Sequence, residues 1–430
     1  MGAAAPGATR AAAAAVADQR LSHDTSRLDS GLTVVTEQVP HLHSASVGFW
    51  VGTGSRDEAP DLAGASHFLE HLLFKGTERL TARAIAEAID AVGGEMNAFT
   101  TKEYTAFYVR VLGTDLDLAL DVLTDIMWDP AFRAEEVEAE RHVILEEILM
   151  RGDEPADLAQ ELLFEALYPG HPLGRDVLGD EDTIEAMSRD DVAAFFAHHY
   201  RPGNMVVAAA GAVEHERLVE RLAAAPSRDG DPARAERSAP GNRPEARVVL
   251  ERPTEQAHVA LGVPGLDVED PDRYALALVE QILGGGMSSR LFQEIREERG
   301  LAYSVYSFRA AFADTGMLGV YAGTAPDREG EVVDLIGRAL DLMAADGPST
   351  RELEVAKGQL RGSMLLGLED SAGRMSRIGR SELVHGEVPS IDDVLSRVDA
   401  VTLDDARKVA ARVLGADRSL AVVGPRSVSL

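Results

Sequence analysis

The sequence predicts an α+β protein of two similar domains, each a mainly antiparallel sheet covered by helices, with a linker between them. Three observations support this fold class. At 430 residues the chain is too long for one ordinary hydrophobic core. A run of strands followed by helices occurs twice, unlike the strict strand–helix alternation of a parallel sheet. Between the two copies, residues 225–245 are rich in proline, glycine and charge without periodicity, as linkers are.

The first half of the chain begins with strands and continues with helices. Residues 28–51 alternate between apolar and polar side chains, which predicts two strands joined by a Pro/His turn. A helix that contains two histidines follows and ends near Gly76, because glycine suits the position after a helix end. The remaining predicted elements are a helix at 82–92, a Gly-Gly turn at 93–94, strands within 97–111, and helices at 115–128 and 134–151.

The second half repeats this order of elements. A Gly-Gly-Gly run at 284–286 is expected to end a helix, because it lacks the spacing of a nucleotide-binding loop and does not follow a strand. The predicted elements are strands at 246–251 and 256–262, helices at 274–283 and 289–299, strands at 302–311 and 316–323, and a helix at 328–345.

Composition limits the classes of partner. The formal net charge of -30 argues against nucleic acid and anionic membrane. No segment approaches the roughly 18 uninterrupted apolar residues of a membrane span. The chain contains no cysteine, so any metal ligands must be His, Asp or Glu. This composition fits a reducing compartment, and we expect a cytoplasmic location.

His67, Glu70 and His71 form the motif with the clearest chemistry. The histidines are four residues apart and therefore lie on one helix face, roughly 5–6 Å apart at Cβ, close enough to share one metal ion. The order His-x-x-Glu-His is the inverzincin motif. Catalytic zinc usually takes three protein ligands, so a third is expected elsewhere. By element order Leu276 and Glu280 lie opposite the two histidines, so the second half should hold no matching site.

The glutamate-rich helix at 134–151 supplies candidates for the third ligand. At about 100° per residue, Glu140 and Glu147 fall inside an apolar arc of the helix. Buried carboxylates need a partner, and either a metal ion or an inward salt bridge to an arginine would serve. The apolar residues of the arc are Val137, Val143, Ile144 and Ile148.

Residues 140–148 read Glu-Arg-His-Val-Ile-Leu-Glu-Glu-Ile and place Glu147 76 positions after His71. This segment and the His-x-x-Glu-His motif together resemble the paired motifs of the M16 (pitrilysin/insulinase-like) metallopeptidases. The processing-peptidase-like branch is most similar in length, and the resemblance extends over most of the chain. It implies a zinc endopeptidase with one zinc per chain, bound by His67, His71 and Glu147. Glu70 would be the general base, and Glu140 a second carboxylate that orients the site.

The glycine start and alternating pattern of residues 94–101 are typical of an exposed sheet edge, which can bind an extended peptide by strand addition. The segment resembles the family's substrate-binding strand, where Asn97, Ala98 and Phe99 would contact the peptide. An ordinary inner strand is the alternative, since the pattern alone does not separate edge from centre.

Arg296 and Tyr303 resemble an Arg/Tyr pair of the same family, which comes from the opposite domain to grip substrate and stabilise the transition state. Arg299 is a competing candidate for the arginine. A structural role is the alternative for both members of the pair, because Arg296 also fits a surface ion pair on its helix.

The resemblance assigns functions to the parts of the chain. We expect a disordered Ala-rich tail at 1–24, for which a targeting segment is the alternative, and a catalytic zinc-binding domain at 25–224. After the linker, residues 246–430 would form a homologous domain without metal that contributes to substrate binding.

The expected reaction is hydrolysis of unfolded peptides or presequence-like extensions. Family members of this length form chambers from two chains, and because one chain here carries both motifs, a homodimer is the simpler expectation. The acidic charge suggests a preference for basic residues near the cleaved bond. Two alternatives stay open: a general oligopeptide scavenger, and a non-catalytic subunit on the same fold.

Overall fold

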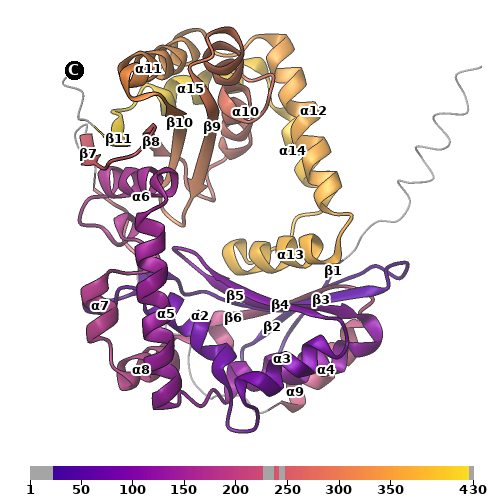
Figure 1. Cartoon of the computed structure of the whole chain (residues 1–430). Coiled ribbons are helices and arrows are strands. Elements are labelled where there is room, and N and C mark those ends of the chain that lie inside the picture. The colour runs from indigo at the N-terminus through magenta and orange to yellow at the C-terminus, as the bar shows by residue number, and fades with distance from the viewer. Residues whose placement is uncertain (1–22, 226–236, 242–246, 426–430) are drawn as a thin grey trace, which may run out of the picture.

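The structure, a computed structural model, describes residues 23–225, 237–241 and 247–425 and contains two mixed sheets with helices (Figure 1). The predicted tail lies outside these residues except for His23 and Asp24, which belong to a strand. The fold class predicted from the sequence is confirmed.

The first sheet has six strands in the order β1-β2-β6-β3-β5-β4. β2 and β6 run parallel, and the other neighbouring strands are antiparallel. The sheet therefore ends at β4 on one side, which becomes important below. Its strands are β1 (His23–Arg27), β2 (Thr33–Gln38), β3 (Ser44–Val51), β4 (Glu95–Thr100), β5 (Thr105–Leu112) and β6 (Met205–Gly211).

The second sheet has five strands in the order β7-β11-β8-β10-β9. Again one pair, β7 and β11, is parallel and the others are antiparallel. In each sheet the parallel pair joins the first or second strand of that half to its last strand, β6 in the first sheet and β11 in the second. The strands are β7 (Arg247–Glu251), β8 (Ala257–Gly265), β9 (Ala302–Ala311), β10 (Gly316–Thr324) and β11 (Ser419–Gly424).

The helices of the two halves cover the sheets and connect them. In the first half they are α2 (Ala65–Leu72), α3 (Ala82–Asp90), α4 (Leu116–Trp128), α5 (Ala134–Gly152), α6 (Pro155–Leu167), α7 (Glu181–Ala186), α8 (Arg189–His199) and α9 (His215–Ala224). In the second half they are α10 (Arg273–Gly284), a π-helix (Phe292–Glu298), α11 (Glu329–Asp346), α12 (Thr350–Gly367), α13 (Ser371–His385), α14 (Ile391–Ala400) and α15 (Leu403–Leu414).

Each half contributes one helix to the sheet of the other half (Figure 1). α6 packs on β8 and β11, where a Cβ on Gly262 would lie 2.9 Å from a methyl carbon of Leu163. α13 packs on β2, β3 and β6. There Glu37, which is fully buried, pairs with Arg374 and Arg377 of α13. The two halves are therefore held together by packed helices and buried charge, and not by a linker alone.

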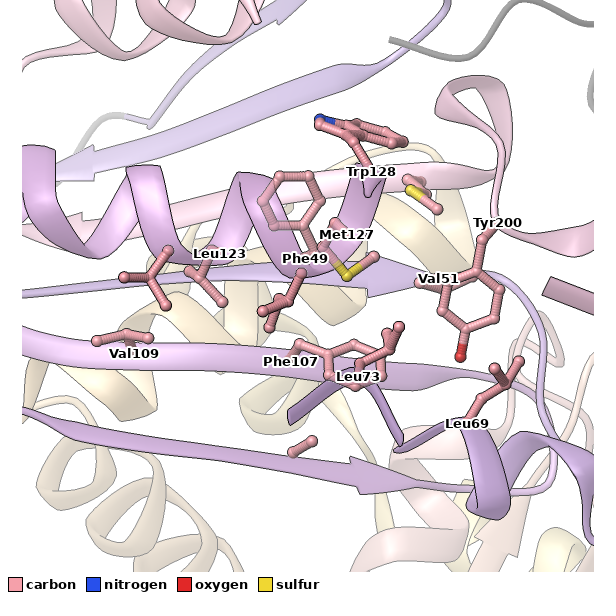
Figure 2. Close-up of a cluster of buried hydrophobic side chains, with 14 of the residues drawn as sticks. Phe49, Val51, Leu69, Leu73, Phe107, Val109, Leu123, Met127, Trp128 and Tyr200 are labelled. Carbon is pink, nitrogen blue, oxygen red and sulfur yellow. The ribbon is translucent and has the colours of Figure 1, made fainter. Parts of the chain in front are cut away.

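α2 is fixed by the core of the first domain (Figure 2). Leu69 and Leu73 lie in a buried cluster with Phe107 of β5 and Tyr200. Fully burying a leucine stabilises a fold by about 1.5–3 kcal/mol. Because residues three and four apart share a helix face, this packing turns His67 and His71 away from the centre of the core.

Most predicted elements agree with the structure. The sequence analysis did not predict β1, β6 and β11, or the helices α6 to α9 and α12 to α15. The predicted helix at 289–299 contains the π-helix, whose wider turns the apolar spacing does not reveal. In the predicted linker, 226–236 and 242–245 lie outside the described residues, but Arg237 binds Asp57, with Nε and Nη2 donating to the carboxylate at 2.8 and 2.7 Å.

None of the helices in the part of the chain that the structure describes combines the length and apolar composition required to cross a bilayer.

Candidate metal centre

The N-terminus of α2 is held by a buried carboxylate. Glu58 Oε2 accepts from the backbone N–H of Gly64 and Oε1 from that of Ser66, both at 2.8 Å. Gly64 has φ 92°, and a Cβ there would lie 2.5 Å from the carbonyl oxygen of Leu178, so only glycine fits. Burial raises the pKa of Glu58 to about 7, although the two backbone donors oppose this shift. This cap fixes the start of the helix, Ala65, two residues before His67.

His67, His71 and Glu147 converge. Glu147 Oε2 lies 3.7 Å from His67 Nε2 and 3.6 Å from His71 Nε2. Of the residues that the structure describes, these three form the one group of potential ligands whose atoms all lie within 4.8 Å of one another. Two histidine nitrogens and a carboxylate oxygen are a donor set that zinc prefers.

The geometry and protonation of these three residues fit a zinc ion. Ligand atoms on one tetrahedral zinc are roughly 3.3 Å apart, slightly less than the spacing from Glu147 to each histidine. Burial lowers the pKa of His67 to about 3, and the charges of His71 and Arg151 act in the same direction. His67 is therefore neutral near pH 7, the state that a metal ligand requires.

The two carboxylates of α5 differ in exposure. The Glu140 side chain is 6% exposed, whereas that of Glu147, at the edge of the buried face of α5, is 43% exposed. The expected apolar arc is wrong at Val143, which is 48% exposed. Val137, Glu140 and Ile144 of the expected arc are buried, and Arg141 beside them is buried as well. Because Glu147 lies at the edge of this face, a metal ion bound to it would be accessible to solvent and substrate.

Glu140 contacts Nδ1 of His71, the ring nitrogen that does not face Glu147. Its Oε2 lies 3.0 Å from His71 Nδ1, and its Oε1 lies 2.6 Å from Lys75 Nζ. The inward salt bridge considered for these carboxylates is thus present for Glu140, with a lysine in place of the arginine. A carboxylate at Nδ1 favours the ring tautomer that keeps Nε2 free for a metal.

Glu70 faces the same side of α2. Its Oε2 accepts a hydrogen bond of 2.6 Å from Thr100 Oγ1 at the end of β4. Burial raises the pKa of Glu70, while Thr100 and His71 oppose that shift and Glu147 adds to it. A carboxylate with a raised pKa beside a metal site is suited to accept a proton from water.

β4 is an edge strand of the first sheet, as predicted, and the inner-strand alternative is wrong. Asn97 is exposed and Ala98 is 9% exposed. Phe99 packs against Trp50, with ring centroids 5.7 Å apart, and against Tyr104. Thr100 therefore connects the exposed edge of β4 to Glu70. Phe99 instead packs against neighbouring aromatic rings and stabilises the sheet.

Arg296 and Tyr303 contact each other rather than the histidines. Arg296 Nη1 donates to the Tyr303 carbonyl at 2.9 Å, and its guanidinium lies 4.4 Å from the Tyr303 ring and 4.7 Å from the Phe292 ring. Tyr303 is 76% exposed. Within the described residues no hydrogen bond or ion pair joins this pair to the three potential metal ligands. The competing Arg299 instead pairs with Glu294 at 3.1 Å.

Three residues that contact the site were not predicted from the sequence: Glu58, Lys75 and Thr100. Lys75 had a usable signal, because it continues the four-residue spacing of His67 and His71. Glu58 and Thr100 reach α2 from loop and strand positions, and no spacing within the helix points to them.

The fold and this site together define a class: a two-domain α+β protein with a His-His-Glu group that could hold a metal ion, beside a sheet edge. Comparison with known proteins agrees. The family described as Insulinase (Peptidase family M16) matches residues 33–181, and that described as Peptidase M16 inactive domain matches residues 186–360. The chain belongs to peptidase family M16, and the resemblance seen in its motifs is confirmed.

Relatives match along nearly the whole chain. An uncharacterized zinc protease of Streptomyces coelicolor is 49% identical over 93% of this chain and 88% of its own length. An uncharacterized zinc protease of Bacillus subtilis, YmxG, is 38% identical over 92% of this chain and 97% of its own length.

Two solved structures share the fold. A peptidase M16 inactive domain from Pseudomonas fluorescens has a TM-score of 0.87 at 24% identity and covers 95% of this chain and 100% of its own. A protease from Helicobacter pylori has a TM-score of 0.87 at 23% identity and covers 94% of this chain and 99% of its own. At these identities the likeness establishes the fold alone.

Proposed function

We propose that this chain is a zinc-dependent endopeptidase that hydrolyses unfolded peptides or presequence-like extensions. The observation that carries the proposal is the convergence of His67, His71 and Glu147 beside Glu70. The zinc protease names of relatives that match nearly end to end support it. One zinc ion per chain is expected, held by the two histidine Nε2 atoms and a Glu147 carboxylate oxygen.

A zinc ion held there would supply Lewis acidity for the peptide carbonyl and for water. Glu70 would accept the proton of the attacking water and later deliver it to the leaving amine, as a general base that becomes a general acid. Thr100 holds the Glu70 carboxylate in place for this transfer. Glu140 keeps the His71 ring oriented.

An extended peptide would add to β4 as a further strand, with main-chain hydrogen bonds to Asn97 and Ala98. This mode favours unfolded segments, because a folded substrate cannot present a free strand. The exposed side chain of Tyr303, with Arg296 behind it, would contact the substrate from the second domain, and in a homodimer from the partner copy. Two copies closing around a chamber would further restrict entry to short or unfolded chains.

The acidic net charge favours substrates with basic residues near the cleaved bond, and a cytoplasmic location fits a cysteine-free chain. A general oligopeptide scavenger would use the same site without this preference. Cleavage of a mixed peptide library separates the two, because a scavenger shows no enrichment of Arg or Lys at any position.

The deciding experiment measures zinc content and hydrolysis of an internally quenched peptide by the purified full chain and by Glu70→Gln. We expect about one zinc in both proteins, with hydrolysis reduced at least about 100-fold in the variant. Equal hydrolysis by the two proteins would contradict the role of Glu70. Zinc binding without hydrolysis would favour the alternative of a non-catalytic subunit.

A further inference from the structure

The side chain of Lys75 is the third member of a row on one helix face. His67, His71 and Lys75 are spaced by four residues, and the row continues from α2 into the short 3₁₀-helix Leu73–Lys75. Gly76 ends it with φ 119°, a backbone conformation that favours glycine. The end of the helix therefore fixes where the Lys75 side chain begins.

Lys75 and His71 contact opposite oxygens of one carboxylate. Lys75 Nζ lies 2.6 Å from Glu140 Oε1, and His71 Nδ1 lies 3.0 Å from Glu140 Oε2. Exposure falls from 33% for the Lys75 side chain to 22% for His71 and 6% for Glu140. The carboxylate is thus enclosed between a cation and a ring nitrogen.

This arrangement resolves an electrostatic problem of the site. A buried carboxylate without a cationic partner is costly, and it would turn toward water or take up a proton. With Oε1 held by an ammonium group, Oε2 stays directed at Nδ1 as an acceptor. The Nδ1–H tautomer of His71 follows, and Nε2 is left unprotonated toward Glu147. By contrast, the buried Nδ1 of His67 has no hydrogen-bond partner among the described residues.

We propose that Lys75 is a positioning residue of the metal centre, which acts through Glu140 to fix the ring orientation and tautomer of His71. The inference rests on the proposed zinc function, and it assigns Lys75 no contact with metal or substrate. The competing explanation is an ion pair that only stabilises the fold.

The test compares Lys75→Met, Lys75→Gln and Lys75→Arg with a control, Arg290→Met. Arg290 forms an ion pair with Glu352 at 2.6 Å, the same separation as that of Lys75 and Glu140, and the exposure of the Arg290 side chain, 27%, is close to that of Lys75, 33%, so its loss removes a cation of similar exposure in the second domain. Zinc affinity of each full chain is measured by competition with a chromophoric chelator. We expect about a tenfold loss for Lys75→Met and Lys75→Gln, less than threefold for Lys75→Arg, and no change for Arg290→Met.

A second measurement uses metal-free protein. Nitrogen NMR of labelled histidine should report His71 protonated at Nδ1 in the wild type and a mixture of tautomers in Lys75→Met. Unchanged zinc affinity together with an unchanged tautomer, in variants that remain folded by circular dichroism, would overturn the proposal. If Lys75→Met does not fold, Lys75→Gln decides the question, because it keeps a donor to Glu140 but removes the charge.

The two measurements also separate this inference from the proposed function. A wild-type chain that binds zinc but hydrolyses no peptide contradicts the peptidase and leaves the role of Lys75 intact. A wild-type chain that binds no zinc contradicts the metal centre, and the tautomer of His71 then decides whether Lys75 acts through Glu140.

Discussion

Thr100 Oγ1 donates a 2.6 Å hydrogen bond to Glu70 Oε2 and so joins the last residue of the edge strand to the carboxylate on the histidine helix. The two residues are 30 positions apart in sequence and come from different elements. If a peptide adds to β4 as proposed, a shift of this strand would reach Glu70 through the hydrogen bond. Substrate binding and proton transfer would share this one contact.

Replacing Thr100 by Val should reduce peptide hydrolysis and move its pH dependence. The hydrogen bond from Thr100 lowers the pKa of Glu70 against the effect of burial, so its loss raises that pKa further. Glu70 must be ionised to act as a base, so the acidic limb of kcat/KM should move to higher pH, with kcat/KM reduced about tenfold at neutral pH. Thr100→Ser keeps the hydroxyl and should resemble the wild type. An unshifted acidic limb in Thr100→Val would contradict the contact's role.

Replacing Glu147 by Gln should remove most of the zinc affinity. The amide oxygen is neutral and a weaker ligand than a carboxylate, so we expect a loss of at least about 100-fold in zinc affinity. The neighbouring Glu146 is exposed and does not belong to the group of potential metal ligands, which makes Glu146→Gln the matched control. Isothermal titration with zinc measures both. Similar affinities in the two variants would exclude Glu147 as a ligand.

Replacing Glu37 by Gln should lower the free energy of unfolding substantially. The Glu37 side chain is fully buried and pairs with Arg374 and Arg377 of α13, so the change leaves two largely buried guanidinium groups without their counter-charge. The expected cost is about 3 kcal/mol. Glu87→Gln, which breaks an exposed pair with Arg83, should cost less than about 0.5 kcal/mol. Urea unfolding measures both, and equal small costs would show that the buried pair does not hold α13.

Replacing Glu58 by Gln should alter how stability depends on pH. The pKa of Glu58 is about 7 in the folded chain and 4.5 in its unperturbed state. Below pH 4.5 the carboxyl group is protonated in both states. Between 4.5 and about 7 it ionises mainly in the unfolded chain, so this group's stabilising contribution is lost as the pH rises, by about 3 kcal/mol in all.

Glu58→Gln removes this titration. The free energy of unfolding of the wild type, measured relative to the variant in metal-free protein, should therefore fall between pH 4.5 and 7. A difference that is constant across this range would mean that the pKa of Glu58 is not raised.

Helix spacing predicted which residues of each helix share a face, whereas the choice of Glu147 rather than Glu140 as the third ligand came from the family resemblance. The four-residue step from His67 to His71 and the seven-residue step from Glu140 to Glu147 each define one face of a helix. Which face is buried was less certain: Val143 was assigned to the core and is exposed, because the apolar stripe of α5 is narrow and interrupted by charged residues.

Contacts between distant segments could not be predicted in this way. The bond from Thr100 to Glu70 and the pairing of Glu37 with α13 depend on tertiary packing, which leaves no periodic trace in the sequence.

The packing of α6 and α13 on the sheet of the opposite half also constrains how the chain can fold during synthesis. The face of the first sheet that includes Val35, Trp50 and Val206 is covered by Met375 and Ile378 of α13. A nascent chain that ends before residue 371 cannot cover this apolar surface with its own residues. The first half can assemble its own core during synthesis, but this face of its sheet is completed only when α13 has emerged, near the end of the chain.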